Sequence, residues 1–258
     1  MNVTKSMIKA LLKEKAFVLY GQPKWTFGKN TCNTYEVFAE MILTADRGTM
    51  HAQEIMPMIE ADEELTDLFG TWFLEAALQT GEQLKTMTGV KIVLSMNVLG
   101  FQVNHPESFD KIKRALDKSF FTPKYIQFEL SEAQQLTNTG IENLTRMREE
   151  LGIKLVLGNF GTGHSNFDIL RLVKFDTIEL DKSFVRRLPQ NRQDVQLLVG
   201  ILHFADTVGL SVCAKGVETA EQMEVLESIG VEKGQGYLIG KPMPIDELAE
   251  FIKKYAKK

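Results

Sequence analysis

Two spacings of apolar residues alternate along most of the chain. Short apolar runs rich in β-branched and aromatic residues are followed by stretches in which apolar residues recur every three to four positions, the spacing of an amphipathic helix. The expected strands are FVLYGQ, TYEVFAEMI, KIVLSMN, YIQFEL, KLVLGN, TIEL, LSVCA and GQGYLI. The expected helices between the later strands include FDKIKRALDKSF, IENLTRMREELG, DVQLLVGILHFADTVG and AEQMEVLESIG.

This repeated strand–helix order predicts an α/β fold with a mainly parallel sheet, and a closed TIM-like (β/α)8 barrel is its natural form. An open doubly wound sheet is the alternative, but the chain lacks the phosphate-binding glycine fingerprint that such a sheet carries after its first strand. The first two expected strands lie close together and are joined by a polar turn region. We expect one domain over residues 1–258, with an N-terminal helix over 1–15 and the barrel over 16–250.

Composition narrows the classes of function. Lysine and arginine number 30 against 34 acidic residues, so no strong basic field favours nucleic acid or an anionic membrane. Charges interrupt the apolar residues near the N-terminus, which excludes a signal peptide or membrane span there. The two cysteines, Cys32 and Cys213, have no metal-binding spacing and suit a reducing, cytoplasmic compartment.

Polar residues recur where the expected strands end. These positions are Asn97, Glu129, Gly158-Asn159, Glu179, Lys215 and Gln235, and Glu36 lies within an early strand between apolar neighbours. Reacting groups of a β/α barrel gather at the carboxyl ends of its strands. Each residue alone is typical of a cap or loop anchor, but their repetition predicts one common polar pocket.

Such a pocket raises the question of metal-assisted hydrolysis. A two-metal site needs several converging carboxylates, and magnesium prefers oxygen ligands. Glu36, Glu129 and the neutral Asn97 are candidate ligands, whereas Gly158 and Asn159 bring no negative charge. The residues alone therefore predict a weak metal site.

The motifs FGTGHSNF, IELDKSFV, AKGVET and GQGYLIGKP resemble, in order and spacing, those of the EAL-domain family of cyclic di-GMP phosphodiesterases. The resemblance covers nearly the whole chain and implies a TIM-like barrel with one antiparallel strand. It also implies a metal-dependent activity, with magnesium or manganese as the cofactor wherever that activity is retained.

Several family positions are kept. The signature Glu-Ala-Leu corresponds to Glu36-Val37-Phe38, and the resemblance assigns metal binding to Glu36, Asn97 and Glu129. It places Gln235 near the catalytic water and Glu132 beside a loop that it steadies. Gln22 corresponds to a nucleotide-contacting glutamine, and Asp181 keeps a charge that contacts a ligand or anchors a strand end.

Other positions depart from the family. Two metal-binding aspartates are replaced by Gly158 and Asn159, a lysine beside the attacking water by Glu179, and a glutamate proposed as base or metal partner by Lys215. An arginine that contacts ligand phosphate corresponds to Glu40. The formal charge at the metal and base positions thereby changes from −4 to −2. We therefore expect no catalytic residues, no resident cofactor, and metal ligands that are weak or unoccupied.

The changes at Glu179 and Lys215 suggest a reversed ion pair. Adjacent strands lie about 4.8 Å apart, so a double exchange of lysine and glutamate would preserve the pair. Two independent surface changes are the alternative.

Three functions remain open. The first is a degenerate EAL domain that regulates by binding another protein, without the cyclase or sensor domains common in relatives. The second is a non-catalytic cyclic di-GMP receptor, which Gln22 favours and Glu40 opposes. The third is a weak metal-dependent phosphodiesterase that uses Glu36, Asn97 and Glu129. A homodimer is a further possibility, because barrel-side helices pair in relatives.

Overall fold

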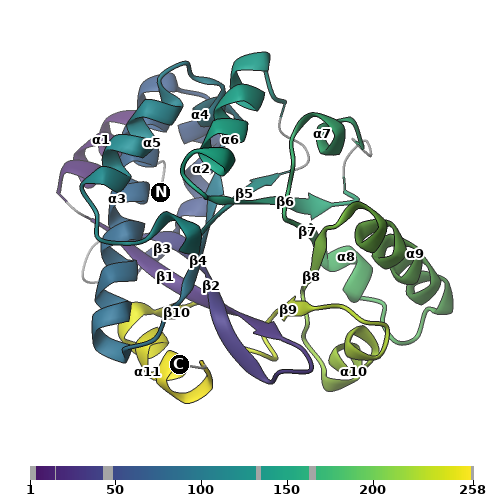
Figure 1. Cartoon of the computed structure of the whole chain (residues 1–258). Coiled ribbons are helices and arrows are strands. Elements are labelled where there is room, and N and C mark those ends of the chain that lie inside the picture. Colours follow the sequence, from purple (N-terminus) through teal and green to yellow (C-terminus); the bar gives the residue numbers. More distant parts are fainter. Residues whose placement is uncertain (1–3, 15, 43–48, 132–134, 163–166, 257–258) are drawn as a thin grey trace.

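The computed structural model describes residues 4–14, 16–42, 49–131, 135–162 and 167–256. Within these residues the strands form a ring with helices around its outside (Figure 1). The strands are β1 (Phe17–Thr26), β2 (Thr31–Ile42), β3 (Thr49–His51), β4 (Val93–Val98), β5 (Ile126–Ser131), β6 (Lys154–Phe160), β7 (Thr177–Leu180), β8 (Ser211–Lys215), β9 (Lys233–Gln235) and β10 (Met243–Pro244).

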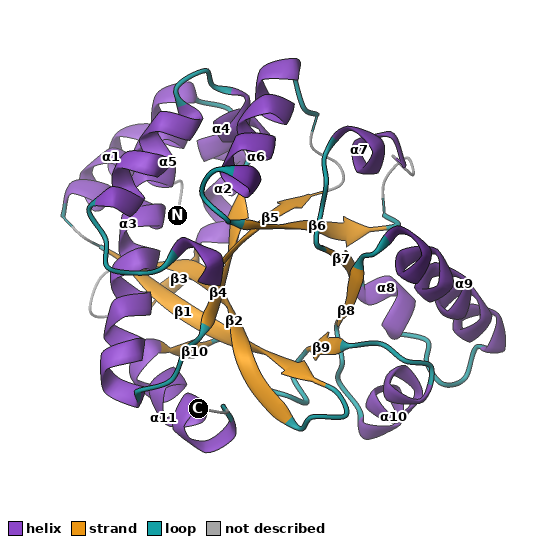
Figure 2. Cartoon of the chain, in the orientation of Figure 1, coloured by secondary structure: helices purple, strands orange, loops and turns teal. Residues whose placement is uncertain are grey.

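The ring runs β1–β2–β4–β5–β6–β7–β8–β9 and closes back onto β1. Strand β1 is antiparallel to both of its ring neighbours, and the other ring pairs are parallel. The short strands β3 and β10 pair with β2 and β1 beside the ring (Figure 2). This topology confirms the expected TIM-like barrel with one antiparallel strand, and the doubly wound alternative is wrong.

Helices follow most of the parallel strands. They are α1 (Lys5–Lys13), α2 (Ala52–Glu60), α3 (Glu63–Thr88), α4 (Gly100–Asn104), α5 (Ser108–Asp117), α6 (Asn138–Glu149), α7 (Phe167–Leu172), α8 (Lys182–Val185), α9 (Arg192–Val208), α10 (Ala220–Ser228) and α11 (Ile245–Tyr255). A 3₁₀ turn, η1 (Pro123–Tyr125), precedes β5. None of the helices in the described residues has the length and apolar character needed to cross a lipid bilayer.

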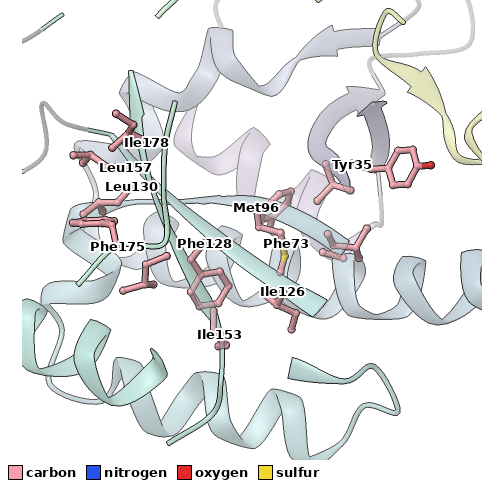
Figure 3. Packing of buried hydrophobic residues seen from close by; sticks show 14 of the residues in the cluster. Tyr35, Phe73, Met96, Ile126, Phe128, Leu130, Ile153, Leu157, Phe175 and Ile178 are labelled. Carbon is pink, nitrogen blue, oxygen red and sulfur yellow. The ribbon is translucent and has the colours of Figure 1, made fainter. Parts of the chain in front are cut away.

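The apolar core lies between the barrel wall and its helices. In β5, Ile126, Phe128 and Leu130 are buried and face this layer, where Phe128 lies near Met96 of β4 (Figure 3). Because side chains alternate along a strand, the intervening Gln127 and Glu129 face the inside of the ring. On β5 the barrel interior therefore carries polar side chains in place of the usual branched apolar ones.

Strand β9 is shorter than the sequence pattern predicts. Of the expected GQGYLI strand only Gly234 and Gln235 pair in the sheet, together with the preceding Lys233, and residues 236–239 form a bend and a turn. The chain at Gly236 lies so close to Val217 that a Cβ there would sit 2.1 Å from the Val217 carbonyl oxygen. This close approach fixes Gln235 at the end of the strand.

Candidate functional site

Strand register brings the predicted polar residues to one end of the barrel. Glu36 lies opposite Ser95, two residues before Asn97, and Asn97 lies opposite Glu129. On the other side of the ring, Lys215 lies opposite Gln235. These predicted residues come together at one end of the barrel as a polar cluster, in which Glu36, Glu129 and Gln235 are almost completely buried.

A chain of amide groups holds Glu36. Asn97 Nδ2 donates to Glu36 Oε1 at 2.7 Å, and Gln235 Nε2 donates to Glu36 Oε2 at 2.9 Å. Gln235 Nε2 also donates to Gln22 Oε1 at 3.1 Å, and Gln22 Nε2 donates to the Gly240 carbonyl at 2.9 Å. Both oxygens of the predicted metal ligand Glu36 are therefore already hydrogen-bonded.

Lys24 of β1 is the centre of the buried part of the site. Its ammonium group contacts Glu129 Oε1, lies 2.5 Å from Glu179 Oε1 and donates to Ser95 Oγ at 3.2 Å. Ser95 Oγ is 2.5 Å from Glu129 Oε1. The Lys24 side chain is only 2% exposed, so its charge depends on these partners and not on water.

Lys215 of β8 binds the same carboxylates from the mouth of the barrel. Its Nζ atom lies 2.8 Å from Glu179 Oε2, 3.0 Å from Glu129 Oε2 and 3.2 Å from Glu36 Oε2. The Glu179–Lys215 ion pair expected from the double exchange is confirmed. It belongs to a larger cluster, because each lysine contacts more than one carboxylate.

Two carboxyl groups of the cluster, Glu129 and Glu179, have pKa values shifted in opposite directions. Burial acts to raise the pKa of Glu129, but Lys215 and Lys24 outweigh it and hold that pKa well below the usual range. Burial and the charge of Glu129 raise the pKa of Glu179 to about 6, and the lysines offset only part of this effect. Burial opposes the charge of both lysines, yet the nearby carboxylates keep the pKa of each raised. Of Glu129 and Glu179, Glu179 is therefore the one that accepts a proton first.

Strand β6 brings no carboxylate to this site. Gly158 lies opposite Ser131, and a Cβ built there would meet only the Leu130 carbonyl oxygen, at an ordinary 3.7 Å. Asn159 has a left-handed backbone, with φ of 55°, and its exposed side chain donates to Ser131 Oγ at 3.4 Å. The described residues leave room for a Cβ at position 158, so their packing does not impose the glycine.

Two predicted positions lie apart from the cluster. Asp181 Oδ1 accepts a hydrogen bond from the Ser183 amide at 2.8 Å and caps α8, which supports its role as a strand-end anchor. Glu40 is buried in β2, in register with Val18 of β1 and His51 of β3. The predicted loop residue Glu132 lies outside the described residues.

Lys24 and Ser95 were not predicted as site residues. Both carry a detectable signal, because each is two positions from a residue that was predicted, Gln22 and Asn97 respectively. Residues two apart in a strand face the same side of the sheet. This spacing places Lys24 on the same side of β1 as Gln22, but it does not reveal the carboxylates that Lys24 contacts.

The donor set does not fit a divalent metal in its present arrangement. Among the described residues, no group of three or more His, Cys, Asp or Glu side chains has a geometry suited to holding a metal ion. The carboxylates that would bind such an ion are turned toward the ammonium groups of Lys24 and Lys215.

Comparisons with known proteins agree on one family. A family model described as EAL domain matches residues 5–242. Cyclic di-GMP phosphodiesterase NbdA of Pseudomonas aeruginosa is 28% identical over 211 residues, which cover 81% of this chain and 27% of that protein. Probable cyclic di-GMP phosphodiesterase PdeA of Escherichia coli is 28% identical over 241 residues, covering 92% of this chain and 32% of that protein.

The fold is also found among solved structures. The MucR phosphodiesterase of Pseudomonas aeruginosa, in complex with cyclic di-GMP, aligns with a TM-score of 0.84 at 23% identity. The alignment covers 93% of this chain and 97% of that one. By contrast, the chain spans only about a quarter to a third of the length of the two curated relatives above.

Proposed function

The chain belongs to the EAL-domain family, and from this premise we propose that it acts in cyclic di-GMP signalling without hydrolysing the nucleotide, as a regulator that binds another protein. The names of its relatives support the signalling part of this proposal, because NbdA and PdeA are described as cyclic di-GMP phosphodiesterases, PdeA as a probable one. The non-hydrolytic part rests on the side chains of this chain.

The observation that carries the proposal is the position of Lys215. Its ammonium group lies within 3.2 Å of carboxylate oxygens of Glu36, Glu129 and Glu179. Metal-assisted phosphodiester hydrolysis needs such carboxylates to hold metal ions that activate water and stabilise the leaving oxygen. Here the Lys215 ammonium group contacts those carboxylate oxygens. Strand β6 contributes Gly158 and the exposed amide of Asn159 where further acidic side chains would be needed.

A second candidate function is a receptor for cyclic di-GMP. It is favoured by Gln235, whose buried Oε1 accepts no hydrogen bond within the described residues. It is opposed by Gln22, whose amide nitrogen and oxygen are both engaged within the protein. The acidic Glu40, at the position assigned to a phosphate-binding arginine, also opposes anion binding. Protein binding is therefore the first choice.

The nucleotide part of the proposal is tested by calorimetric titration with cyclic di-GMP, without and with Mg²⁺ or Mn²⁺, followed by chromatography of the products. We expect no linear dinucleotide under any of these conditions. Tight binding that needs no metal would instead favour the receptor, and turnover by the unmodified chain would contradict the proposal. As a control, Gly158→Asp, Asn159→Asp, Glu179→Lys and Lys215→Glu combined should form linear dinucleotide at least about 100-fold above the detection limit, since loss of even outer metal contacts costs about 10–100-fold.

The protein-binding part needs a separate measurement. It predicts a complex of fixed stoichiometry with one cellular protein, detectable by size-exclusion chromatography of the co-purified pair in the absence of nucleotide. A complex that forms only after cyclic di-GMP is added would favour the receptor instead.

A further inference from the structure

The turn between α8 and α9 concentrates positive charge. Residues 186–192 hold three of the chain's eight arginines, and all three side chains are exposed. Together with neighbouring amide side chains they line an open hollow of about 650 Å³, which we call the arginine hollow: Arg186, Arg187, Gln190, Asn191, Arg192 and Gln193. No acidic side chain of the described residues lines it. The hollow is therefore suited to an anionic ligand.

Arg187 is held in place by a nearly buried acid. Its Nε atom lies 2.7 Å from Asp194 Oδ2, and its Nη2 atom donates to Asp194 Oδ1 at 2.9 Å. The Asp194 side chain is 10% exposed, whereas that of Arg187 is 65% exposed. One edge of the guanidinium group is thus bound to the protein, while much of the side chain stays open to solvent. A group that is already ordered loses less entropy when it binds a ligand.

Arg186 and Arg192 carry the uncompensated charge of the arginine hollow. Of the three arginines, Arg187 alone forms an ion pair with a described residue. Three guanidinium groups and the single Asp194 carboxylate give a local charge of +2, on a chain whose formal net charge is −4. This local excess would attract an anionic segment of a partner, while the overall charge disfavours an extended polyanion such as nucleic acid.

The amides at the start of α9 are already engaged. Asn191 Oδ1 accepts hydrogen bonds from the amides of Gln193, at 3.0 Å, and Asp194, at 3.4 Å. Phosphate groups at a helix N-terminus bind such amides, and these two are taken. The donors that remain are planar guanidinium groups, whose geometry matches a carboxylate with two parallel hydrogen bonds. Arg187 already contacts the Asp194 carboxylate in this way.

We propose that the arginine hollow binds a partner protein through a segment of clustered aspartate and glutamate side chains, whose carboxylates pair with the three guanidinium groups. This inference rests on the proposed function, because it names the chemistry by which the regulator recognises its partner. The arginine hollow shares no residue with the buried cluster of lysines and carboxylates.

The test titrates a short fluorescein-labelled polyglutamate peptide with the purified chain and follows fluorescence anisotropy, without nucleotide or metal. Arg186→Gln combined with Arg192→Gln should weaken binding by about fivefold or more, since exposed ion pairs contribute modestly and two are removed. Arg187 is left unchanged because its loss would leave the nearly buried Asp194 carboxylate unpaired. A polyglutamine peptide of the same length should not bind.

A matched variant removes the same charge elsewhere. Arg114→Gln combined with Arg171→Gln changes exposed arginines on α5 and α7 and should bind the peptide within about twofold of the unmodified protein. Hydrogen–deuterium exchange of the unmodified protein locates the contact independently, because the peptide should slow exchange in residues 185–196 more than elsewhere. This second measurement decides the matter if the Arg186→Gln and Arg192→Gln variant does not fold.

Three results would overturn the inference. They are no binding of polyglutamate by the unmodified protein, the same affinity in both double variants, and displacement of the peptide by inorganic phosphate at matched ionic strength, which would make the hollow a phosphate site.

Failure of this inference is distinct from failure of the proposed function. A complex with a cellular protein that is unaffected by Arg186→Gln and Arg192→Gln would refute the role of the arginine hollow and leave the proposed function standing. Hydrolysis of cyclic di-GMP would refute the proposed function and leave peptide binding untouched.

Discussion

At the scale of single residues, Glu179 stands out in the buried cluster because the two lysines compensate only part of the cost of its negative charge. It is 1% exposed and shares two lysines with Glu129, while Glu36 adds a third negative charge nearby. Protonation of Glu179 would leave two carboxylates facing two ammonium groups. The cluster would then be neutral, which is the cheaper state in a low-dielectric interior.

Glu179→Gln is therefore expected to stabilise the protein at pH 7.5, by about 1–2 kcal/mol. The sign follows from the pKa of about 6, which is raised from its ordinary value of 4.5. The native state then holds the proton more tightly than the unfolded chain, so this group favours folding below pH 4.5 and loses that contribution as pH rises through 6. The advantage of the variant should shrink as pH falls from 7.5 toward 4.5.

Urea unfolding at pH 7.5 and pH 5 measures this difference. Glu250→Gln is the control, because Glu250 is an exposed acid paired with Lys253 on α11, and it should show no such dependence on pH. A Glu179→Gln variant that is less stable than the unmodified protein by the same amount at both pH values would contradict the prediction.

The sequence predicted which residues belong to the site better than which of their side chains contact one another. Glu36, Asn97, Glu129 and Gln235 could be placed together because they follow the ends of expected strands, and the Glu179–Lys215 pair followed from the spacing of adjacent strands. Lys24 was missed because a single lysine in a strand is usually exposed at an edge. Its burial depends on three strands across the barrel, which no local pattern reveals.

At the scale of elements, α3 shows how packing overrides helix propensity. The described helix contains Gly70 and Gly81, each of which lowers helix stability by about 1 kcal/mol relative to alanine. Gly81 faces a ring and the barrel wall, whereas Gly70 faces the end of a flexible side chain. A Cβ at Gly81 would lie 2.6 Å from the Phe121 ring and 2.8 Å from Leu94, and one at Gly70 would lie 1.5 Å from Gln102.

Gly81→Ala is expected to destabilise the protein by about 1–2 kcal/mol, because overpacking against a ring and the barrel wall outweighs the gain in helix propensity. Gly200→Ala in α9 makes the same chemical change where no atom lies within 4 Å of the new Cβ. That exposed variant should be more stable by about 0.5–1 kcal/mol. Thermal unfolding of both variants tests the pair, and a stabilised Gly81→Ala would show that the contact relaxes at little cost.

The periodicity of the chain predicted the parallel strands and the helices α5, α6, α9 and α10, whose apolar positions repeat cleanly. It did not predict α3, although α3 is the longest helix among the described residues. Its glycines and threonines weaken the local signal, and what makes it helical is contact with α1, α5, α11 and the barrel. The length of β9 was overestimated because its apolar continuation packs in turns.

At the scale of the whole molecule, the two terminal helices meet on one element. Both α1 and α11 pack against α3, and α11 also covers β1 and β2 (Figure 1). Leu248 of α11 is fully buried and lies so close to Gly21 of β1 that a Cβ there would be 2.3 Å from Leu248 Cδ2. The antiparallel strand is thus held from outside by the C-terminal helix.

Leu248→Ala is therefore expected to cost about 2–5 kcal/mol, because the cavity would form where strand, helix and barrel wall meet. Leu238→Ala removes the same atoms from a side chain that is 43% exposed and should change stability by less than about 0.5 kcal/mol. Urea denaturation followed by both tryptophan fluorescence and circular dichroism measures the cost. Similar small losses in the two variants would mean that α11 is a peripheral addition.

The two buried lysines also join strands that are not neighbours in the sheet. Lys24 on β1 contacts Glu129 on β5 and Glu179 on β7, and Lys215 on β8 contacts Glu129 as well as Glu179 on the adjacent β7, so several ion pairs cross the lumen of the barrel. Pulling one of these strands away from the sheet would break several ion pairs at once and leave their buried charges unpaired. Under mechanical tension, such a barrel should resist unzipping strand by strand and rupture in a single event.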